Sequence, residues 1–189
     1  MLSKEEIRKS ILRARELEPG RDAKSLIIQE QLLLLPSFAE ACTILSYVGV
    51  GTEVATGVIV EQALRMGKRV AAPYVTKEGL KSAFIHSRAD LVPARFGLLE
   101  PAEEIRQEIT RASDVSEVDL FVVPGVAFDR RGGRLGHGRA YYDRLLMQAR
   151  SDAQFIAVAF ECQLVSAVPM TATDIFMHAV ITERDIYWP

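Results

Sequence analysis

The beginning of the chain has the hydrophobic spacing of a helix. Apolar residues recur every three to four positions between residues 4 and 18, and Pro19-Gly20 would end the helix that this spacing predicts. Ser3 followed by Glu6 is a capping-box pattern, in which each side chain bonds the other residue's backbone N–H at a helix start. We therefore expect a first helix from residue 4 to residue 18.

A second helical pattern ends at Pro36, because proline disrupts a helix that continues through it. Its markers are Leu26, Ile27, Gln31, Leu34 and Leu35. A short helical piece is expected at residues 38–41, and the mostly apolar residues 43–48 predict a buried strand. Thr56 is a suitable N-cap for a further helix that Gly67 would close. This part of the chain is therefore expected to form a strand followed by a helix.

Further short apolar segments predict the rest of a sheet. They lie at residues 69–72, where Pro73 would end the strand, and at 80–86, 120–123, 156–160 and 179–182. Residues 87–117 have a weaker pattern, with an ordered loop expected from Phe96 to Pro101. Strands that alternate with helices predict an α/β fold, a three-layer α/β/α sandwich with a mainly parallel sheet. A length of 189 residues fits a single domain over residues 1–189.

The exit of the strand at residues 43–48 is a candidate binding position. In open α/β sheets, ligands bind outside the carboxyl ends of the strands. Val48 ends this strand and Glu53 follows it, so both are placed to line a site. Glu53 could equally be a carboxylate that only complements the dipole of the next helix.

The stretch from Asp129 to Arg144 is the clearest candidate for chemistry. Its sequence, D-R-R-G-G-R-L-G-H-G-R-A-Y-Y-D-R, contains four glycines and five arginines. Glycines permit close backbone approach, so backbone N–H groups can converge on an anion while the arginines supply positive charge. Helical spacing resumes from Arg139, so the loop should lead into a helix N-terminus, which also favours anions. The expected order is strand, phosphate-binding glycine loop and helix.

A simpler interpretation of this stretch stays open. It matches neither the P-loop pattern nor the dinucleotide-binding fingerprint, so it could be a solvated arginine-rich surface loop. Two features favour a site. Tyr141 and Tyr142 are large amphipathic residues beside the loop, and Asp143 would project near a bound phosphate, where Mg²⁺ is often held by one or two carboxylates.

Composition narrows the range of partners. The chain has 23 basic and 25 acidic residues and a net charge of −2, so no global charge favours nucleic acid or an anionic membrane. Its start has no apolar signal segment, and the longest uninterrupted apolar run, residues 155–160, is too short to span a membrane. Cys42 and Cys162 have no metal-binding spacing and are expected to be reduced and buried. We expect a monomeric cytoplasmic protein that acts on small molecules.

The glycine and arginine stretch resembles the signature of the 5-formyltetrahydrofolate cyclo-ligase family, also called 5,10-methenyltetrahydrofolate synthetases. The specific matches are Arg134-Leu135-Gly136, Gly138 and Tyr141-Tyr142-Asp143-Arg144. Weaker matches cover nearly the whole chain, at Lys4, Arg8 and residues 53–56, 97–101, 123–129, 174 and 181–183. Three residues depart from the family pattern. Arg139 stands where lysine is usual, Ala140 where a third glycine is usual, and His178 where many members have a second aspartate.

The resemblance implies two substrates, ATP and 5-formyltetrahydrofolate, with Mg²⁺ as cofactor. It assigns ATP binding to Lys4, Arg8, Arg134, Leu135, Gly136, His137, Gly138, Arg139, Ala140, Tyr141 and Tyr142. It assigns the folate to Val48, Glu53 and Tyr141, with Glu53 accepting hydrogen bonds from the pterin ring, and Mg²⁺ to Asp143 and Asp174. Arg139 is the expected catalytic residue, in contact with the γ-phosphoryl group. His178 is expected to be structural, with a metal role less favoured.

The reaction that the resemblance implies is ATP-dependent ring closure of 5-formyltetrahydrofolate to 5,10-methenyltetrahydrofolate, with release of ADP and phosphate. Two alternatives stay open. A phosphosugar isomerase of related α/β architecture could use a similar phosphate loop, although no carboxylate or lysine base stands out for it. A non-catalytic folate-binding relative would keep Glu53 while losing phosphate or metal groups, and the departures at 139, 140 and 178 are compatible with that.

Overall fold

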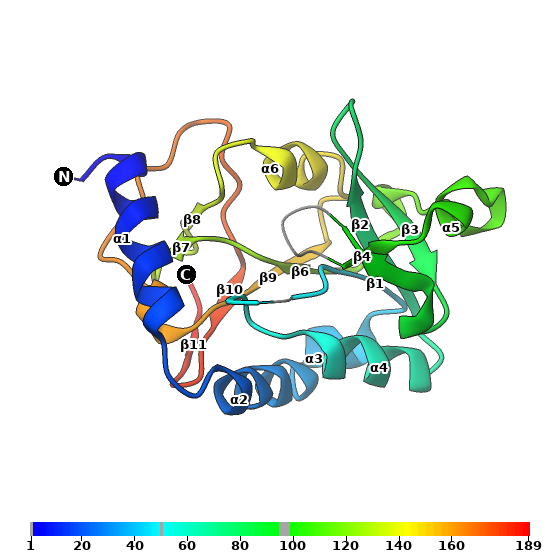
Figure 1. Ribbon diagram of the computed structural model, residues 1–189, viewed down its shortest axis with the longest axis horizontal. Helices are drawn as coiled ribbons and strands as arrows, with labels where there is room; N and C mark the ends of the chain where they lie inside the picture. The colour runs from blue at the N-terminus through cyan, green and yellow to red at the C-terminus, as the bar shows by residue number, and fades with distance from the viewer. Residues whose placement is uncertain (1, 50, 95–98) are drawn as a thin grey trace.

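The computed structural model describes residues 2–49, 51–94 and 99–189 of the chain (Figure 1). Its centre is a seven-stranded sheet in the order β11-β10-β9-β6-β1-β2-β3. The strands are β1 (Thr43–Ser46), β2 (Arg69–Val75), β3 (Leu80–Ile85), β6 (Leu120–Val123), β9 (Gln154–Val158), β10 (Ala179–Ile181) and β11 (Ile186–Tyr187). Six of these seven strands lie where the hydrophobic pattern predicts strands.

The sheet is mainly parallel, as expected. β1 pairs in parallel with β2 and β6, and β9 pairs in parallel with β6 and β10. Only the two edge strands differ, because β3 runs antiparallel to β2 and β11 antiparallel to β10. The expected α/β class and parallel sheet are therefore confirmed.

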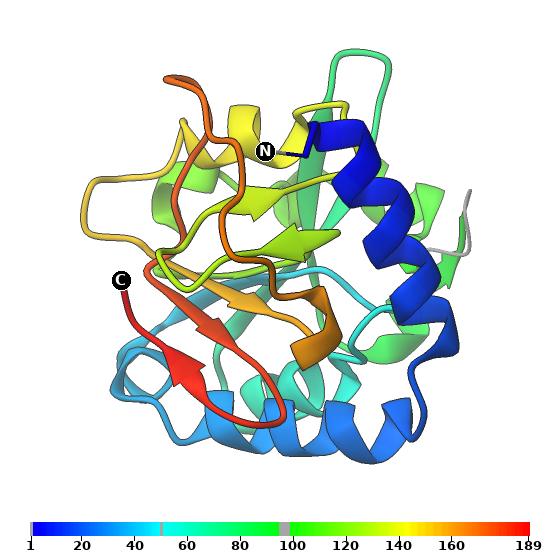
Figure 2. The ribbon, with the colours of Figure 1, turned by 90° about the vertical axis from the view of Figure 1, so that its left-hand side faces the viewer.

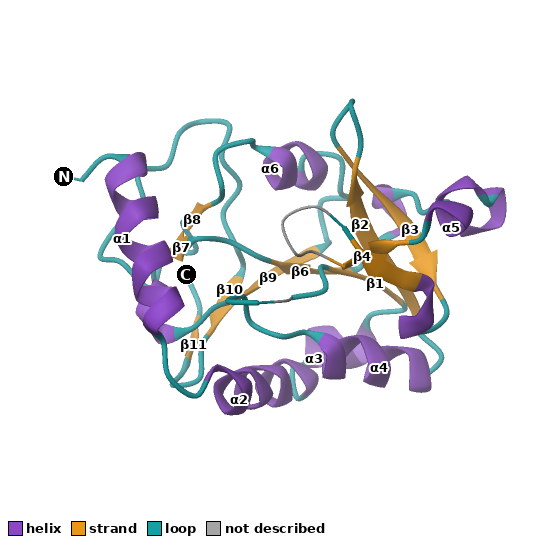
Figure 3. Cartoon of the chain, viewed as in Figure 1, coloured by secondary structure: helices purple, strands orange, loops and turns teal. Residues whose placement is uncertain are grey.

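Helices cover the two faces of the sheet unequally (Figures 1 and 3). One face carries α2 (Arg21–Leu33), α3 (Pro36–Glu40) and α4 (Gly57–Arg65). The other carries the short helix α6 (Tyr141–Leu146) and a hairpin of β7 (Ala127–Phe128) and β8 (Arg134–Leu135). Helix α1 (Lys4–Leu17) lies beside that hairpin (Figure 2), with the predicted capping box of Ser3 and Glu6 at its start. The three-layer arrangement is confirmed.

A small second unit adjoins the β3 edge. It consists of a two-stranded sheet, β4 (Leu91–Pro93) with β5 (Leu99–Pro101), followed by α5 (Glu103–Gln107). The loop expected from Phe96 to Pro101 is described only at residues 99–101, where it is β5; residues 96–98 lie outside the described part of the chain.

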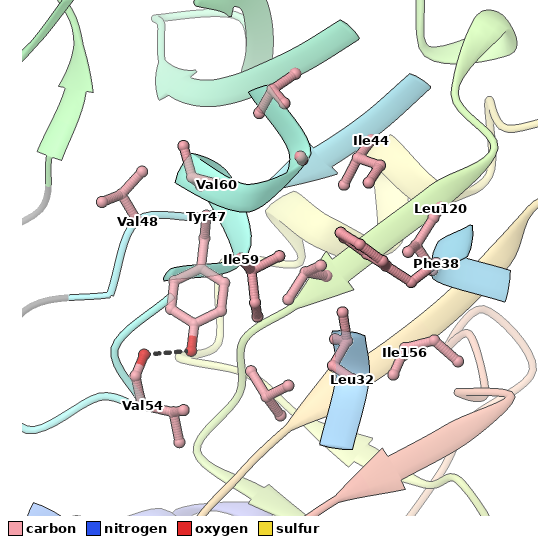
Figure 4. Packing of buried hydrophobic residues seen from close by; sticks show 14 of the residues in the cluster. Leu32, Phe38, Ile44, Tyr47, Val48, Val54, Ile59, Val60, Leu120 and Ile156 are labelled. Atoms are coloured by element: carbon pink, nitrogen blue, oxygen red, sulfur yellow. Dashed lines mark hydrogen bonds between the residues drawn. The ribbon is translucent and has the colours of Figure 1, made fainter. Parts of the chain in front are cut away.

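The sheet is buried on both faces, which explains why its central strands are apolar at successive positions. In β6, Leu120 and Val122 pack towards α2, α3 and α4 (Figure 4), whereas Phe121 and Val123 pack towards α6. These four side chains are fully buried. The parallel centre of the fold is therefore a continuous core between two layers.

The buried face of α2 differs from the expected one. Leu26, Ile27 and Leu34 are exposed, and the helix instead buries Ile28 and Leu32 together with polar residues. The polar residues are Ser25 and Gln29, whose side chains accept hydrogen bonds from the backbone N–H groups of Ala55 and Val58. Because α2 supports the turn before α4 through polar groups, the apolar markers in the sequence pointed to the wrong face.

Two further expectations about strand and helix ends are corrected. Pro73 does not end β2, which continues to Val75, because β1 pairs with β2 only up to Ala71 and needs no N–H from Pro73. Thr56 occupies the N-cap position of α4 without capping it. Its hydroxyl donates to the carbonyl of Tyr47 at 2.6 Å and accepts from the N–H of Gly49 at 3.1 Å, so it fixes the β1–α4 turn.

The two cysteines differ in exposure. Cys42 is exposed, contrary to expectation, and Cys162 is partly buried; both are free thiols. Burial and a hydrogen bond to Glu18 raise the pKa of the Cys162 thiol to about 12. Among the described residues, no helix is long and apolar enough to cross a membrane.

Candidate active site

A cavity of about 1630 Å³ opens at the carboxyl edge of the sheet. Tyr47 follows β1, Pro124 follows β6 and Val75 ends β2, and all three line the cavity. This is the edge at which open α/β sheets bind ligands. The size of the cavity is sufficient for more than one drug-sized ligand.

Most of the residues that the sequence assigns to binding line this cavity. They are Glu53, Arg134, Gly136, His137, Arg139, Ala140, Tyr141, Tyr142 and Asp143. They come from the β1–α4 turn, from β8 and from the segment that leads into α6. The fold therefore brings together residues that are far apart in the sequence.

Two of the assigned residues point elsewhere. Val48 is buried in the core between the sheet and α4 (Figure 4), and it is not among the residues that line the cavity. Leu135 is buried under α1 with Ile7 and Ile11, so its side chain is covered. Neither side chain is in a position to touch a ligand in the cavity.

Four other assigned residues form a rim next to the cavity. Lys4 Nζ lies 2.8 Å from Asp174 Oδ2, and Arg8 Nε donates to the carbonyl of Gly136 at 2.8 Å. Gly138 has a positive φ of 94°, and its α-carbon faces the guanidinium of Arg8. Helix α1 is thereby attached to the glycine turn, residues 136–140, and brings Lys4 and Arg8 to the site.

The segment before α6 is more ordered than a simple glycine loop. Residues 127–135 form the β7–β8 hairpin, closed by Asp129, whose Oδ1 accepts from the N–H groups of Arg131 and Gly133. Gly132, with a φ of 79°, makes the turn. The expected order of strand, glycine loop and helix is therefore corrected, because Arg134 and Leu135 belong to a strand and only the glycine turn remains as a loop.

The backbone at position 140 shows why glycine is usual there in the family signature. It precedes α6 and adopts the left-handed conformation, with φ 50° and ψ 27°. A side chain in this region is strained, whereas glycine adopts it without steric cost. The third glycine that is usual at this position would fit the same backbone with less strain.

Charges at the glycine turn are only partly neutralised. Arg134 is buried and its Nη2 lies 2.6 Å from Asp143 Oδ1. Arg8 and Arg139 form no ion pair within the described part of the chain, and Arg139 Nη1 donates a long hydrogen bond to the hydroxyl of Tyr141 at 3.4 Å. The turn therefore presents two uncompensated guanidinium groups, which would attract an anion.

Asp143 and Asp174 are neighbours, although they are far apart in sequence. Asp143 Oδ1 accepts from the backbone N–H of Ile175 at 3.5 Å, which places the residue after Asp174 against it. Burial raises the pKa of Asp174, but hydrogen bonds from Lys4 and Thr171 outweigh it and hold the pKa below its usual value. Each carboxylate faces a basic side chain, Lys4 for Asp174 and Arg134 for Asp143, and among the described residues no three metal-binding side chains converge.

The wall of the cavity also contains buried polar atoms without partners in the described part of the chain. They are Glu53 Oε2, Tyr142 Oη, Arg134 Nε and Arg15 Nε. Glu53 Oε1 lies 3.8 Å from both Arg15 Nη1 and His137 Nε2, beyond hydrogen-bond distance. Burial raises the pKa of the Tyr142 hydroxyl, with a further contribution from the charge of Glu53. Unpaired buried polar atoms are costly, so this wall is built for polar groups of a ligand.

Arg15 is a site residue that the sequence analysis missed. It lies in the last turn of α1 and continues the buried face after Ile7 and Ile11, four residues apart. An arginine at a position where the pattern requires an apolar residue is the signal that could have identified it.

His178 lies away from the cavity, before β10. Its Nδ1 accepts from the N–H of Phe155 at 2.9 Å, and its ring packs against that of Phe155 at 5.1 Å. These contacts give it a role in joining β9 to β10.

Comparisons with known proteins identify relatives of this chain. Residues 1–183 match the model of the 5-formyltetrahydrofolate cyclo-ligase family. A 5-formyltetrahydrofolate cyclo-ligase of Mycolicibacterium smegmatis is 33% identical over 147 residues, covering 75% of this chain and 74% of the relative. The enzyme of that name from Escherichia coli is 29% identical over 184 residues, covering 95% and 96%.

A solved structure has the same fold. The structure of Aquifex aeolicus 5,10-methenyltetrahydrofolate synthetase matches with a TM-score of 0.83 at 31% identity, over 99% of this chain and 93% of that one. The family match spans every element that lines the cavity, and we conclude that this chain belongs to the 5-formyltetrahydrofolate cyclo-ligase family, a family of ligases.

Proposed function

We propose that the protein closes the ring of 5-formyltetrahydrofolate to 5,10-methenyltetrahydrofolate at the expense of one ATP, with Mg²⁺ as cofactor. The observation that carries the proposal is that one cavity holds two kinds of polar group. Glu53 and Tyr142 offer unpartnered polar atoms, and the glycine turn with Arg139 offers positive charge. A folate and a triphosphate are a pair of ligands with these two chemistries.

The carboxylate of Glu53 is assigned to the folate. Its Oε2 is buried and free to accept hydrogen bonds, and the pterin ring presents N–H groups along one edge. Tyr142 Oη is likewise free and lines the same cavity. Because a rigid site fixes the ring, the formyl group and N10 of the substrate would be held in position for the reaction.

The triphosphate is assigned to the glycine turn. Arg139 is exposed and unpaired, so its guanidinium can reach the γ-phosphoryl group, and Arg8 lies beside the backbone of Gly136 and Gly138. Phosphoryl transfer depends on positioning and on neutralising the charge of the moving group. Arg134 is less available, because it already pairs with Asp143. We assign it to holding Asp143 in place.

Asp143 and Asp174 fit a magnesium ion. They supply hard oxygen ligands beside the turn, and each has one oxygen without a hydrogen bond in the described residues. Mg²⁺ commonly takes one or two carboxylates and completes its shell with phosphate and water. When bound, it would neutralise charge on the phosphate oxygens. Lys4, which pairs with Asp174, would be close to the same phosphates.

The proposed reaction has two steps, phosphoryl transfer and ring closure. The formyl oxygen attacks the γ-phosphorus of ATP, the bond to the bridging oxygen breaks, and ADP leaves. N10 then attacks the activated formyl carbon and loses its proton, and the carbon–oxygen bond breaks. The formyl oxygen departs within inorganic phosphate. The phosphoryl group is needed because the oxygen by itself is a poor leaving group.

Nucleotide dependence tests this proposal. Protein mixed with 5-formyltetrahydrofolate and Mg-ATP should produce the near-ultraviolet absorbance of the methenyl product, with one ADP formed per product. Formation at full rate without ATP would contradict the mechanism. The family match and the unpartnered Oε2 of Glu53 both favour a folate over the phosphosugar isomerase alternative.

A further inference from the structure

Arg15 is a buried charged residue at the cavity that has no role in the proposed reaction. It is only 5% exposed, it lies in the last turn of α1, and it lines the cavity beside Glu53. Burying a guanidinium is unfavourable unless the group finds hydrogen-bond acceptors. The contacts of Arg15 therefore indicate whether the protein itself satisfies it.

The protein satisfies Arg15 incompletely. Its Nη1 donates to the carbonyl of Gly125 at 3.4 Å, a long hydrogen bond, and lies 3.8 Å from Glu53 Oε1. Its Nε has no partner in the described residues. Arg134, the other buried arginine of the cavity, also has an Nε without a partner, but its guanidinium approaches a carboxylate, Asp143, to 2.6 Å. Arg15 therefore has a carboxylate nearby, but no hydrogen bond to that carboxylate.

A structural ion pair does not account for this arrangement. A buried pair compensates for lost hydration only when its geometry is good and the remaining donors are bonded. Here Glu53 Oε2 and Arg15 Nε are both buried and unbonded, and both belong to residues on the cavity wall. A free acceptor next to a free donor matches a ligand edge that presents N–H beside C=O.

We propose that Arg15 is a specificity-determining residue that donates a hydrogen bond to the ring carbonyl of the pterin, beside the N–H groups that Glu53 accepts. This inference rests on the proposed folate site. Arg15 and Glu53 together would distinguish 4-oxo folates from 4-amino analogues. The guanidinium only donates hydrogen bonds, so it would bond a carbonyl oxygen at position 4 but would face another donor if that position carried an amino group. A site built to hydrogen-bond one group discriminates strongly against a ligand that lacks it.

The test is a ratio of affinities measured by calorimetry without ATP. Dissociation constants for 5-formyltetrahydrofolate and for its 4-amino-4-deoxy counterpart are measured with the wild type and with Arg15→Leu, Arg15→Gln and Arg13→Leu. Arg13 is the matched control, since it is an exposed arginine on the same helix. A general loss of stability affects both ligands alike, so the ratio isolates the contact with the ring carbonyl.

The wild type and Arg13→Leu should prefer the 4-oxo compound by the same factor. Replacing Arg15 should reduce that preference by about 10- to 100-fold, the range expected for one hydrogen bond to a charged group. If Arg15→Leu does not fold, Arg15→Gln decides the question. The smallest expected reduction is about 10-fold. A preference for the 4-oxo compound that stays within about threefold of the wild-type value would therefore overturn the role of Arg15. Failure of the wild type to bind 5-formyltetrahydrofolate would instead overturn the proposed function, and this inference with it.

Discussion

Arg139 lines the cavity and bears a charge that no carboxylate in the described residues neutralises. If it contacts the γ-phosphoryl group during transfer, Arg139→Ala should lower kcat by about 10³-fold, as for other arginines that act on phosphoryl transfer. Steady-state kinetics at saturating folate and ATP measure this effect.

Arg139→Lys separates charge from shape at the same position. Lysine keeps the positive charge and loses only the bidentate fork, so this variant should retain most activity. Both variants should bind the folate as the wild type does, because the pterin is assigned to Glu53 and Tyr142 and not to Arg139. Normal turnover in Arg139→Ala would show that Arg139 is only a surface charge.

Ala140 stores backbone strain at the same turn, with its φ of 50°. Ala140→Gly should raise the free energy of unfolding by about 1 kcal/mol, because the gain from removing strain exceeds the entropy cost of glycine. Urea unfolding measures the change. Ala14→Gly, within α1, is the control and should destabilise by about 1 kcal/mol, because its backbone is helical. Equal destabilisation by both changes would show that position 140 is not strained.

At the scale of elements, the hydrophobic pattern predicts the strands better than it predicts the exposed surfaces. Six of the seven sheet strands follow from short apolar segments, since a strand buried on both faces is apolar at nearly every position. The buried face of α2 could not be found this way. Ser25 and Gln29 are buried because they bond the turn before α4, a contact that local sequence does not reveal.

The junction between α6 and the C-terminal segment carries the proposed metal site. Asp143→Asn and Asp174→Asn should each raise the Mg²⁺ concentration needed for half-maximal rate by about 10-fold or more, because a neutral amide binds the ion weakly. Folate affinity should change little. Asp22→Asn, an exposed change in the first turn of α2, is the control. Lost folate binding with an unchanged Mg²⁺ requirement would move both residues out of the metal site.

The same two variants should differ in stability. Asp143→Asn leaves Arg134 buried without its counter-charge and should cost about 1–3 kcal/mol. Asp174→Asn releases Lys4, which is about a third exposed, so its cost should stay below about 1 kcal/mol. Urea unfolding without nucleotide provides the comparison, and equal losses would contradict the difference in burial.

His178 makes the β9–β10 junction sensitive to pH. Partial burial of its ring lowers the pKa of His178 below the usual 6.5, and only the neutral ring can accept from the N–H of Phe155. The unfolded chain therefore takes up this proton at a higher pH than the folded one. The stability that His178 contributes is present above pH 6.5 and is lost as pH falls below it.

Urea unfolding at about pH 7.5 and about pH 5.5 checks this linkage. The wild type should lose more stability over this interval than His178→Asn, whose side chain can accept the same hydrogen bond without titrating. His86→Asn, an exposed histidine, serves as the control. An equal loss in wild type and His178→Asn would exclude His178 as the source.

At the scale of the whole molecule, the site is assembled from distant parts of the chain. Lys4 meets Asp174, Arg8 meets Gly136, and Arg15 meets Glu53, so α1 is joined to the site along its length, and its Arg15 lines the cavity together with residues that follow β1 and β6 and residues of β2. Sequence motifs identify the residues of the glycine turn one by one. They could not show the pairing of Arg134 with Asp143 or the role of Arg15, because these depend on how α1 and the β7–β8 hairpin pack.

In the proposed reaction, this cavity brings the formyl oxygen of the folate against the γ-phosphoryl group of ATP. Substrate labelled with ¹⁸O in the formyl group tests this transfer, with mass spectrometry of the inorganic phosphate that is released. We expect one ¹⁸O atom in each phosphate formed, in step with the methenyl product. Unlabelled phosphate, with the label recovered in water or formate, would contradict transfer of the phosphoryl group to the formyl oxygen.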